Sequence, residues 1–342
     1  GSVMLRQPIY MGGAIIAANK IADIGEQMAA NDLDMQTQST LYSIDRAYWM
    51  VVSLRQKQKL ANSYRDLVQK LNEDVHKMIK QGVATKADGL KVDVKVNEAD
   101  MQIMQVEDGL TLSKMLLCQL CGIPMDQDIQ LADENKESLG MTGQFVDASV
   151  QQQAAADSAK STRPELKMLQ NTVELTQQSV KLVRAANLPH VALTGGYTIS
   201  NPNVFNGFQK RFTGVWNVGV LVQVPVWNWF DGAYKVRAAK AAANIAQMNL
   251  DDTQEKIHLQ ITQSQFKVKE AERKLNMAMK NIKSAEENLR CANLGFKEGV
   301  MEITDVMAAQ TAWQQAQSQK IDAEIDVKLT QVGLNKALGI LQ

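Results

Sequence analysis

Residues 257–296 read IHLQITQSQFKVKEAERKLNMAMKNIKSAEENLRCANLGF. Apolar or small side chains recur in this stretch at alternating spacings of four and three residues. They are Ile257, Ile261, Ser264, Val268, Ala271, Leu275, Ala278, Ile282, Ala285, Leu289, Ala292 and Phe296. This spacing is the a/d seam of a heptad repeat. It predicts a long α-helix that packs along one stripe against a partner helix.

The same seam resumes beyond Gly299, which predicts a returning antiparallel helix. Its members are Val306, Ala309, Trp313, Ala316, Ala323, Val327 and Leu334. A looser seam precedes Gly82, formed by Ala61, Tyr64, Val68, Leu71, Val75 and Met78. The sequence therefore predicts two long helical hairpins. The outgoing helix of the first, from about Ala14 to Lys80, would be on the order of 100 Å long at 1.5 Å per residue.

The two hairpins come from an internal duplication. They occupy the proline-free windows 9–123 and 226–342, and such windows permit long helices because an interior proline costs about 3 kcal/mol. Matching residues stand at a constant offset of 217, as in Pro8/Pro225, Gly82/Gly299, Val83/Val300, Asp88/Asp305 and Gly122/Gly339. A single offset of this size indicates one duplicated large unit and not a solenoid.

Composition excludes several classes of function. Lysine plus arginine number 37 and aspartate plus glutamate number 37, so the formal net charge is zero. A purely charge-driven partner, such as nucleic acid or an anionic membrane surface, needs clustered uncompensated basic residues. The sequence also has no run of about 18 apolar residues, the length that a transmembrane helix requires.

The segment from His190 to Tyr234 has a different pattern, because it holds nine of the eighteen aromatic residues. Its apolar side chains alternate with small or polar ones at a period of two. They are Val191, Leu193, Tyr197 and Ile199, then Trp216, Val218, Val220, Val222 and Val224. Two amphipathic strands in a hairpin are predicted. Each reaches the ~9–11 residues that cross a bilayer as a tilted strand, and aromatics near the strand ends are typical of interfacial girdles.

A hairpin of a soluble β-sandwich would show the same alternation. A lone hairpin is marginal in water, however, and no other strands are predicted in this chain. We therefore expect these strands to complete a sheet with other chains or with sequence outside this one.

Taken together, the chain resembles the TolC-type outer-membrane efflux channels. The residues that carry the resemblance are the turn into each hairpin (Pro-Ile-Tyr-Met-Gly-Gly at 8–13, and Pro-Val-Trp at 225–227 through Asp231-Gly232) and the tip strings 82–88 and 299–305. The resemblance implies a mainly α fold of long antiparallel coiled-coil hairpins in two structural repeats, which form an α-barrel. It also implies a small amphipathic β-hairpin that contributes to an outer-membrane β-barrel.

The resemblance divides the chain into segments. Residues 1–10 would be the stub of a β-strand, 11–123 the helical hairpin of repeat 1, 124–161 an equatorial segment, 162–188 a helix of repeat 2, 189–227 the transmembrane β-hairpin and 228–342 the helical hairpin of repeat 2. Only seven residues precede Pro8. The helix and first β-hairpin that the family has there are thus expected to be missing, which would leave two of the four strands that each subunit donates.

The function that the resemblance implies is a passive exit duct for efflux or secretion of small molecules or proteins. The subunit would form a homotrimer in the bacterial outer membrane and extend into the periplasm. Its partners would be a periplasmic adaptor (membrane fusion) protein, an inner-membrane RND or ABC transporter, and outer-membrane lipid, with no nucleic acid. A soluble periplasmic coiled-coil scaffold or adaptor is the alternative, because it would share the hairpins.

Two pairs of candidate site residues lie near the hairpin tips. The resemblance implies that Asp88 and Asp305 line the periplasmic entrance. A structural alternative is helix capping, because Thr85-Lys86-Ala87-Asp88 resembles a capping box. Met301 takes the place of a tip arginine of the family, and the position three residues after Asp305 is Ala308, so a closed gate locked tightly by charge is not expected.

The tips themselves align with the family's adaptor-docking motif. The residues concerned are Gly82, Val83, Gly299 and Val300. Each glycine could equally serve as the left-handed C-cap that any helical hairpin uses. We expect both roles, with glycine making the turn and the flanking exposed residues making the contact.

Metal, cofactor and catalytic sites are not predicted. Cys118 and Cys121 have C-x-x-C spacing but lack a second pair or a βαβ setting. They are interpreted as buried helix residues, and a disulfide stays open as an alternative in an oxidising periplasm. Cys291 stands alone, and the three histidines (His76, His190 and His258) follow no metal-binding spacing. The sequence contains no nucleophile or phosphate-binding motif, so it does not suggest an enzyme.

Overall fold

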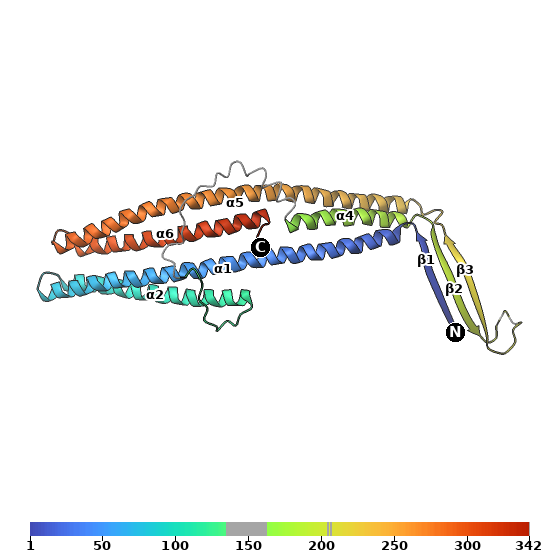
Figure 1. Cartoon of the computed structure of the whole chain (residues 1–342), viewed down its shortest axis with the longest axis horizontal. Helices are drawn as coiled ribbons and strands as arrows, with labels where there is room; N and C mark the ends of the chain where they lie inside the picture. Colours follow the sequence, from blue (N-terminus) through green and yellow to red (C-terminus); the bar gives the residue numbers. More distant parts are fainter. Residues whose placement is uncertain (135–162, 204, 206, 342) are drawn as a thin grey trace. The chain divides into compact units, whose positions relative to one another are not determined.

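The computed structural model describes residues 1–134, 163–203, 205 and 207–341. Its elements are β1 (Ser2–Met11), α1 (Ala14–Lys80), α2 (Lys86–Cys121), α4 (Pro164–Ala185), β2 (His190–Ser200), β3 (Thr213–Gln223), α5 (Asp231–Lys297) and α6 (Ile303–Leu338) (Figure 1). The predicted mainly α fold with two helical hairpins and a small sheet is confirmed. Most of the expected equatorial segment, residues 135–161, lies outside the described part of the chain.

The duplication is present at the boundaries of all four hairpin helices. Helices α1 and α5 have 67 residues each, and α2 and α6 have 36 each. Every helix of the second hairpin begins and ends at the same offset from its counterpart that relates the matching residues of the sequence. The two repeats therefore share helix lengths and turn positions as well as short strings of sequence.

The chain divides into two compact units, and each unit contains segments of both repeats. The first comprises residues 1–35 and 163–256, and the second residues 36–162 and 257–342. The first unit thus holds the sheet, α4 and the initial parts of α1 and α5. The second holds the remainder of α1 and α5 together with α2 and α6. No helix of the described ranges is long and apolar enough to cross a membrane.

The sheet of the first unit has three antiparallel strands in the order β1-β2-β3. The expected strand within residues 1–10 is present, but it is a full strand and not a stub, so the sheet has three strands where two were expected. Strand β1 pairs with β2 over nearly its whole length, from Ser2 opposite Thr198 to Met11 opposite His190. The register shifts between Pro8 and Tyr10, where proline has no N–H to donate to the ladder.

The second unit has an apolar core in which all four hairpin helices meet. Its largest cluster comprises Tyr64, Val68, Leu71, Val75, Val92, Ala99, Leu289, Ala292, Val306 and Ala309. These include residues of both predicted seams. Along α5 and α6, a further cluster is formed by Ala271, Leu275, Ala278, Ala323 and Val327. Small alanines in the seam let the helices approach closely, so each hairpin packs as the heptad pattern predicts.

Residues after α2 fold back against α1 within the second unit. The Tyr48 hydroxyl donates a 2.7 Å hydrogen bond to the Asp133 carboxylate, and Lys59 donates to the Glu134 carbonyl at 3.0 Å. Lys114 of α2 forms a 2.9 Å ion pair with Asp128. Burial and the Asp133 hydrogen bond raise the pKa of Tyr48 to about 12. The beginning of the expected equatorial segment is therefore fastened to the first hairpin.

Candidate functional site

Each hairpin tip is a glycine turn of the Schellman type. Gly82 and Gly299 have φ of 76° and 72°, in the left-handed region where a side chain is strained. The Val83 N–H donates to the Met78 carbonyl at 2.9 Å, and the Val300 N–H donates to the Gly295 carbonyl at 2.8 Å. These are the 6→1 hydrogen bonds that end a helix in this motif. The two repeats therefore reverse the chain by the same mechanism.

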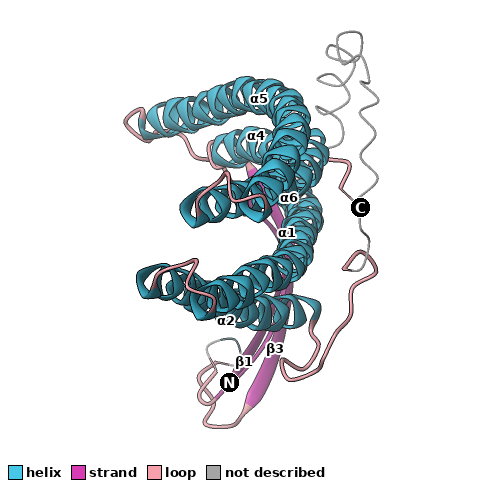
Figure 2. Cartoon of the chain, turned by 90° about the vertical axis from the view of Figure 1, so that its left-hand side faces the viewer, coloured by secondary structure: helices cyan, strands magenta, loops and turns pink. Residues whose placement is uncertain are grey.

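The valine after each glycine is exposed. Val83 has 68% and Val300 81% of its surface accessible. A Schellman motif usually packs this residue against the last turn of its helix, but here most of each side chain remains uncovered. The tips lie at one end of the second unit, which Figure 2 shows from that end. The structure thus leaves an apolar side chain available for contact at each tip.

Asp88 caps α2 and is also paired with a cation. The Thr85 backbone N–H and hydroxyl both donate to its carboxylate, at 3.3 and 2.6 Å, while the Asp88 N–H donates to the Thr85 hydroxyl oxygen at 3.3 Å. Lys91 lies 3.1 Å from the other carboxylate oxygen. The Thr85 hydrogen bond, followed by Lys91, holds the pKa of Asp88 below its usual value. Thr85 and Asp88 therefore form the capping box that their spacing suggested.

Asp305 repeats this arrangement at the start of α6, with a weaker set of contacts. The Glu302 N–H donates to the Asp305 carboxylate at 3.4 Å, and the Thr304 hydroxyl donates to the Glu302 carboxylate at 3.2 Å. Met301 is 38% exposed, and its side chain lies over Gly295, where an added Cβ would come within 2.9 Å of its Cγ. Both carboxylates therefore stand beside a hairpin tip and bind a backbone N–H.

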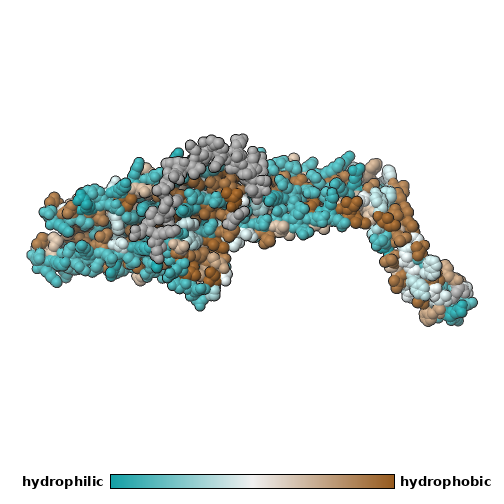
Figure 3. All heavy atoms as spheres, in the orientation of Figure 1, coloured by the Kyte–Doolittle hydropathy of each residue, from teal (hydrophilic) through white to brown (hydrophobic). Residues whose placement is uncertain are grey.

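The sheet gathers the predicted apolar residues of β2 and β3 on one face, while Val224 lies just after the end of β3. Directly opposed residues in antiparallel strands project to the same side, and the register opposes Tyr197 to Trp216, Leu193 to Val220, and Val191 to Val222. Strand β1 adds Val3, opposite Tyr197. The accessible fractions are high, for example 75% for Trp216 and 62% for Val220. Figure 3 shows apolar side chains over this part of the first unit.

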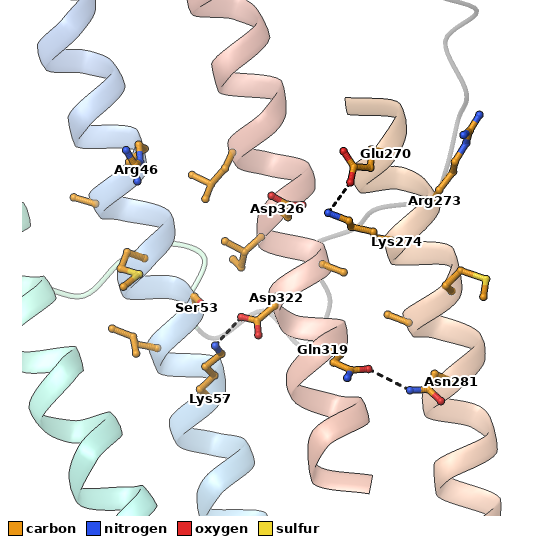
Figure 4. A pocket seen from close by; sticks show the side chains of 18 of the residues that line it. Arg46, Ser53, Lys57, Glu270, Arg273, Lys274, Asn281, Gln319, Asp322 and Asp326 are labelled. Atoms are coloured by element: carbon orange, nitrogen blue, oxygen red, sulfur yellow. Dashed lines mark hydrogen bonds and ion pairs between the residues drawn. The ribbon is translucent and has the colours of Figure 1, made fainter. Parts of the chain in front are cut away.

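A groove of about 1510 Å³ lies between the hairpins of the second unit (Figure 4). Four of its charged side chains form two ion pairs. Lys57 contacts Asp322 at 2.6 Å and Lys274 contacts Glu270 at 3.0 Å, while Asn281 donates to Gln319 at 3.3 Å. The Lys57–Asp322 pair joins α1 to α6 at this groove, and Arg46, Arg273 and Asp326 add further charge to its lining. No group of three or more metal-binding side chains occurs in the residues that the structure covers.

The cysteines and histidines are dispersed. Cys118 is buried, whereas Cys121 and Cys291 are exposed, and all three are free thiols. The Cys118 thiol lies 3.9 Å from the Gln127 carbonyl. The expectation that Cys121 is buried with Cys118 is wrong, because the next residue, Gly122, ends the helix there with φ of 69°. His76 lies 3.3 Å from the Asp93 carboxylate.

Comparison with known proteins identifies the family. The family model of outer membrane efflux proteins matches residues 155–340, more than half of the chain. The chain belongs to the outer membrane efflux protein family. The resemblance to TolC-type channels is thereby confirmed, and with it the outer-membrane location. No curated protein sequence matches the chain significantly.

Solved outer-membrane proteins share the fold at low sequence identity. VceC from Vibrio cholerae has a TM-score of 0.82 at 16% identity, over 99% of this chain and 79% of VceC. The CmeC channel from Campylobacter jejuni has a TM-score of 0.81 at 14% identity, over 99% of this chain and 70% of CmeC. The open state of the MtrE channel from Neisseria gonorrhoeae has a TM-score of 0.76 at 15% identity, over 99% of this chain and 79% of MtrE. The efflux family's hairpins and sheet are thus common to proteins with very different sequences.

Proposed function

We propose that the chain is the subunit of a passive outer-membrane efflux duct, assembled as a homotrimer, without catalytic activity. The observation that carries the proposal is the sheet. Its apolar face is exposed, and β1 and β3 are the edge strands of the described part. An exposed apolar face with two open edges is costly in water and is suited to a closed barrel in lipid.

The apolar face supports lipid as its environment. Val218, Val220 and Val222 follow one another along β3 with 69%, 62% and 58% of their surfaces accessible. Covering such side chains gains roughly 25 cal/mol per Å² of apolar surface. We propose Val191, Leu193, Tyr197, Ile199, Trp216, Val218, Val220, Val222 and Val224 as the lipid-facing residues.

The open edges support assembly with further copies. A backbone N–H or C=O group without a partner costs several kcal/mol in the hydrocarbon region. Pairing an edge of one subunit's sheet with strands of the next removes this cost. A homotrimer that closes the sheet into a barrel is the arrangement the family resemblance implies for these edges.

The tips support the contact with a partner. Val83 and Val300 present exposed apolar side chains beside Gly82 and Gly299, a pattern suited to knob-like packing with another helical hairpin. We propose a periplasmic adaptor as that partner, with an RND or ABC transporter of the inner membrane supplying the energy. Asp88 and Asp305 would then form rings of carboxylates at the periplasmic entrance while they cap α2 and α6.

Membrane extraction tests the proposal, with the whole chain produced in a Gram-negative host. The protein is expected to resist high-salt washing of outer membranes, to dissolve only with detergent, and to yield a cross-linked species of three times the subunit mass. Release by salt without detergent would favour the soluble scaffold and overturn the duct. A matched variant, Val220→Glu, places a charge on the proposed lipid face and is expected to lower the amount recovered in the membrane.

A further inference from the structure

The turn from β3 into α5 uses a backbone conformation that the first repeat assigns to two glycines. Gly12 and Gly13, between β1 and α1, have φ of 61° and 88°. At the offset that relates the repeats, their counterparts are Trp229 and Phe230, with φ of 52° and 62°. Both repeats thus enter the long helix through two consecutive left-handed residues. Only the second repeat places large aromatic side chains there.

Aromatic residues at these two positions strain the backbone. A bulky residue with positive φ is an outlier, because its Cβ approaches the neighbouring carbonyl oxygen, whereas glycine adopts the same conformation freely. The glycine pair at 12–13 demonstrates that the turn itself needs no aromatic side chain. A gain made by the side chains must therefore offset the strain at Trp229 and Phe230.

That gain does not come from burial within the described part of the chain. Trp229 is 82% exposed, Phe230 63% and the adjacent Trp227 65%. The ring of Trp227 makes edge contacts with those of Trp229 and Phe230, at centroid distances of 6.0 and 5.5 Å. We call Trp227, Trp229 and Phe230 the aromatic turn. Its rings contact one another and present their remaining surface outward.

The surroundings of the aromatic turn indicate which environment it meets. It directly follows β3, whose apolar face is proposed to contact lipid. In residues 226–250 the basic residues Lys235, Arg237 and Lys240 outnumber the single acid, Asp231. Lys235 contacts Asp231 at 2.6 Å, and the Arg237 guanidinium lies 5.7 Å from the centroid of the Tyr234 ring. The amphipathic indole rings of Trp227 and Trp229 beside excess positive charge suit the phospholipid headgroup layer.

We infer that the aromatic turn is a membrane-interface anchor, which holds the start of α5 in the phospholipid headgroup layer and is retained at the expense of backbone strain. The inference rests on the proposed membrane location of the sheet. It adds an asymmetry between the repeats, because the glycine turn at 12–13 can make no such contact. The second repeat would then supply most of the anchor, since the first repeat offers only Tyr10, the counterpart of Trp227, which is 47% exposed.

The test uses the full chain labelled with 5-fluorotryptophan, in vesicles of phosphatidylethanolamine and phosphatidylglycerol. Comparison with Trp229→Tyr assigns the fluorine resonance of Trp229. A paramagnetic label on the lipid headgroup is expected to broaden this resonance strongly. A sharp resonance in membrane-bound protein would overturn the anchor, since the ring would then be in solvent or packed against another protein.

Vesicle flotation gives a second readout. The double variant Trp229→Gly, Phe230→Gly restores the glycine pair of the first repeat, and we expect it to keep its melting temperature or gain a few degrees. Its partition constant is expected to fall about tenfold, because two aromatic side chains no longer enter the interface. The partition constant of the variant Trp229→Asn, Phe230→Asn is expected to fall by the same factor, since asparagine tolerates positive φ but lacks the ring. Trp229→Tyr is expected to retain binding.

Phe266→Ala provides the matched control, because Phe266 of α5 is 63% exposed, the same fraction as Phe230. Its partition constant is expected to stay unchanged. If both double variants bind vesicles as well as the unmodified chain does, the proposed anchor is wrong, whereas the proposed efflux duct is unaffected. If the unmodified chain itself fails to bind, the anchor and the proposed membrane location fall together.

Discussion

The side-chain amide of Gln314 on α6 donates a 2.6 Å hydrogen bond to the side-chain oxygen of Gln102 on α2, so that it joins the two repeats. A second bridge lies between α1 and α6, where Gln310 donates to the Leu67 carbonyl at 3.4 Å. Both lie beside the apolar cluster of the second unit. The contact between the hairpins therefore combines an apolar cluster with two side-chain hydrogen bonds.

A double-mutant cycle measures the Gln102–Gln314 bridge. The single variants Gln102→Ala and Gln314→Ala and the double variant are expected to give a coupling energy of about 0.5–1.5 kcal/mol, the usual net value of a partly buried hydrogen bond. Urea unfolding of the detergent-purified unmodified chain and of the three variants supplies the four free energies of the cycle. Asn281 and Gln319 form an exposed pair at 3.3 Å and serve as the control. Equal coupling in the two pairs would contradict the argument from burial.

Truncation of Val306 tests the core beneath the hairpin tips. This side chain has 0% of its surface exposed and belongs to the cluster in which four helices meet. Val306→Ala removes two buried methyl groups and is expected to lower the free energy of unfolding by about 2 kcal/mol. Val94→Ala, at a position 54% exposed on α2, is expected to change it by less than about 0.5 kcal/mol. Denaturant titration compares the two, and a similar loss in both would argue against the packing described.

Two glycine substitutions are expected to act with opposite signs. Gly299→Ala places a Cβ on a residue with φ of 72° and should destabilise the tip by roughly 1–2 kcal/mol. Gly333 lies inside α6 with open space where a Cβ would be added, so Gly333→Ala should stabilise the helix by about 0.5–1 kcal/mol. Thermal melts of the two variants provide the measurement. A loss of stability in both would mean that the conformation of Gly299 is not what distinguishes them.

The helical part of the fold could be predicted from the sequence because its signals are local and repeated. The heptad seam from Ile257 to Phe296 specifies a buried stripe without reference to any distant residue, and the constant offset between the repeats transfers it to the first hairpin. Strand β1 could not be recognised in the same way. Arg6, Gln7 and Pro8 interrupt its alternation, and its hydrogen bonds come from β2, which follows only after the whole first hairpin and α4.

The site was accessible to sequence reasoning only in part. The capping box at Thr85 and Asp88 can be read from spacing, whereas the ion pair with Lys91 depends on rotamers. The left-handed pair Trp229 and Phe230 was missed, because aromatic residues do not suggest positive φ. The signal existed nonetheless, in the alignment of these two residues with Gly12 and Gly13 at the common offset.

The capping carboxylate Asp88 should make part of the stability depend on acid pH. The Thr85 hydrogen bond and Lys91 lower the pKa of Asp88 in the folded chain below its usual value. A carboxyl with a depressed pKa in the folded state stabilises it above the unfolded-state pKa, and this contribution disappears as the pH falls through the folded-state pKa. The difference in melting temperature between the unmodified chain and Asp88→Asn should therefore be largest near neutral pH and vanish in strong acid. Asp34→Asn, at an exposed position in α1, controls for the change in net charge, and a difference independent of pH would contradict the assignment.

Charged substitutions at the hairpin tips test the proposed contact with the adaptor. Val83→Glu and Val300→Glu would place a carboxylate in an apolar contact, which is expected to abolish adaptor-dependent efflux in a host that supplies the adaptor and pump. The cross-linked trimer and its amount in the outer membrane should stay the same, because both valines are exposed and contribute little to folding. Leu112→Glu is the matched control, since Leu112 is 67% exposed against 68% for Val83 and lies more than seven turns along α2 from the tip. Efflux is measured as the accumulation of a fluorescent pump substrate. Normal efflux with both tip variants, or an equal loss of efflux with Leu112→Glu, would mean that the tips do not form the contact with the adaptor on which efflux depends.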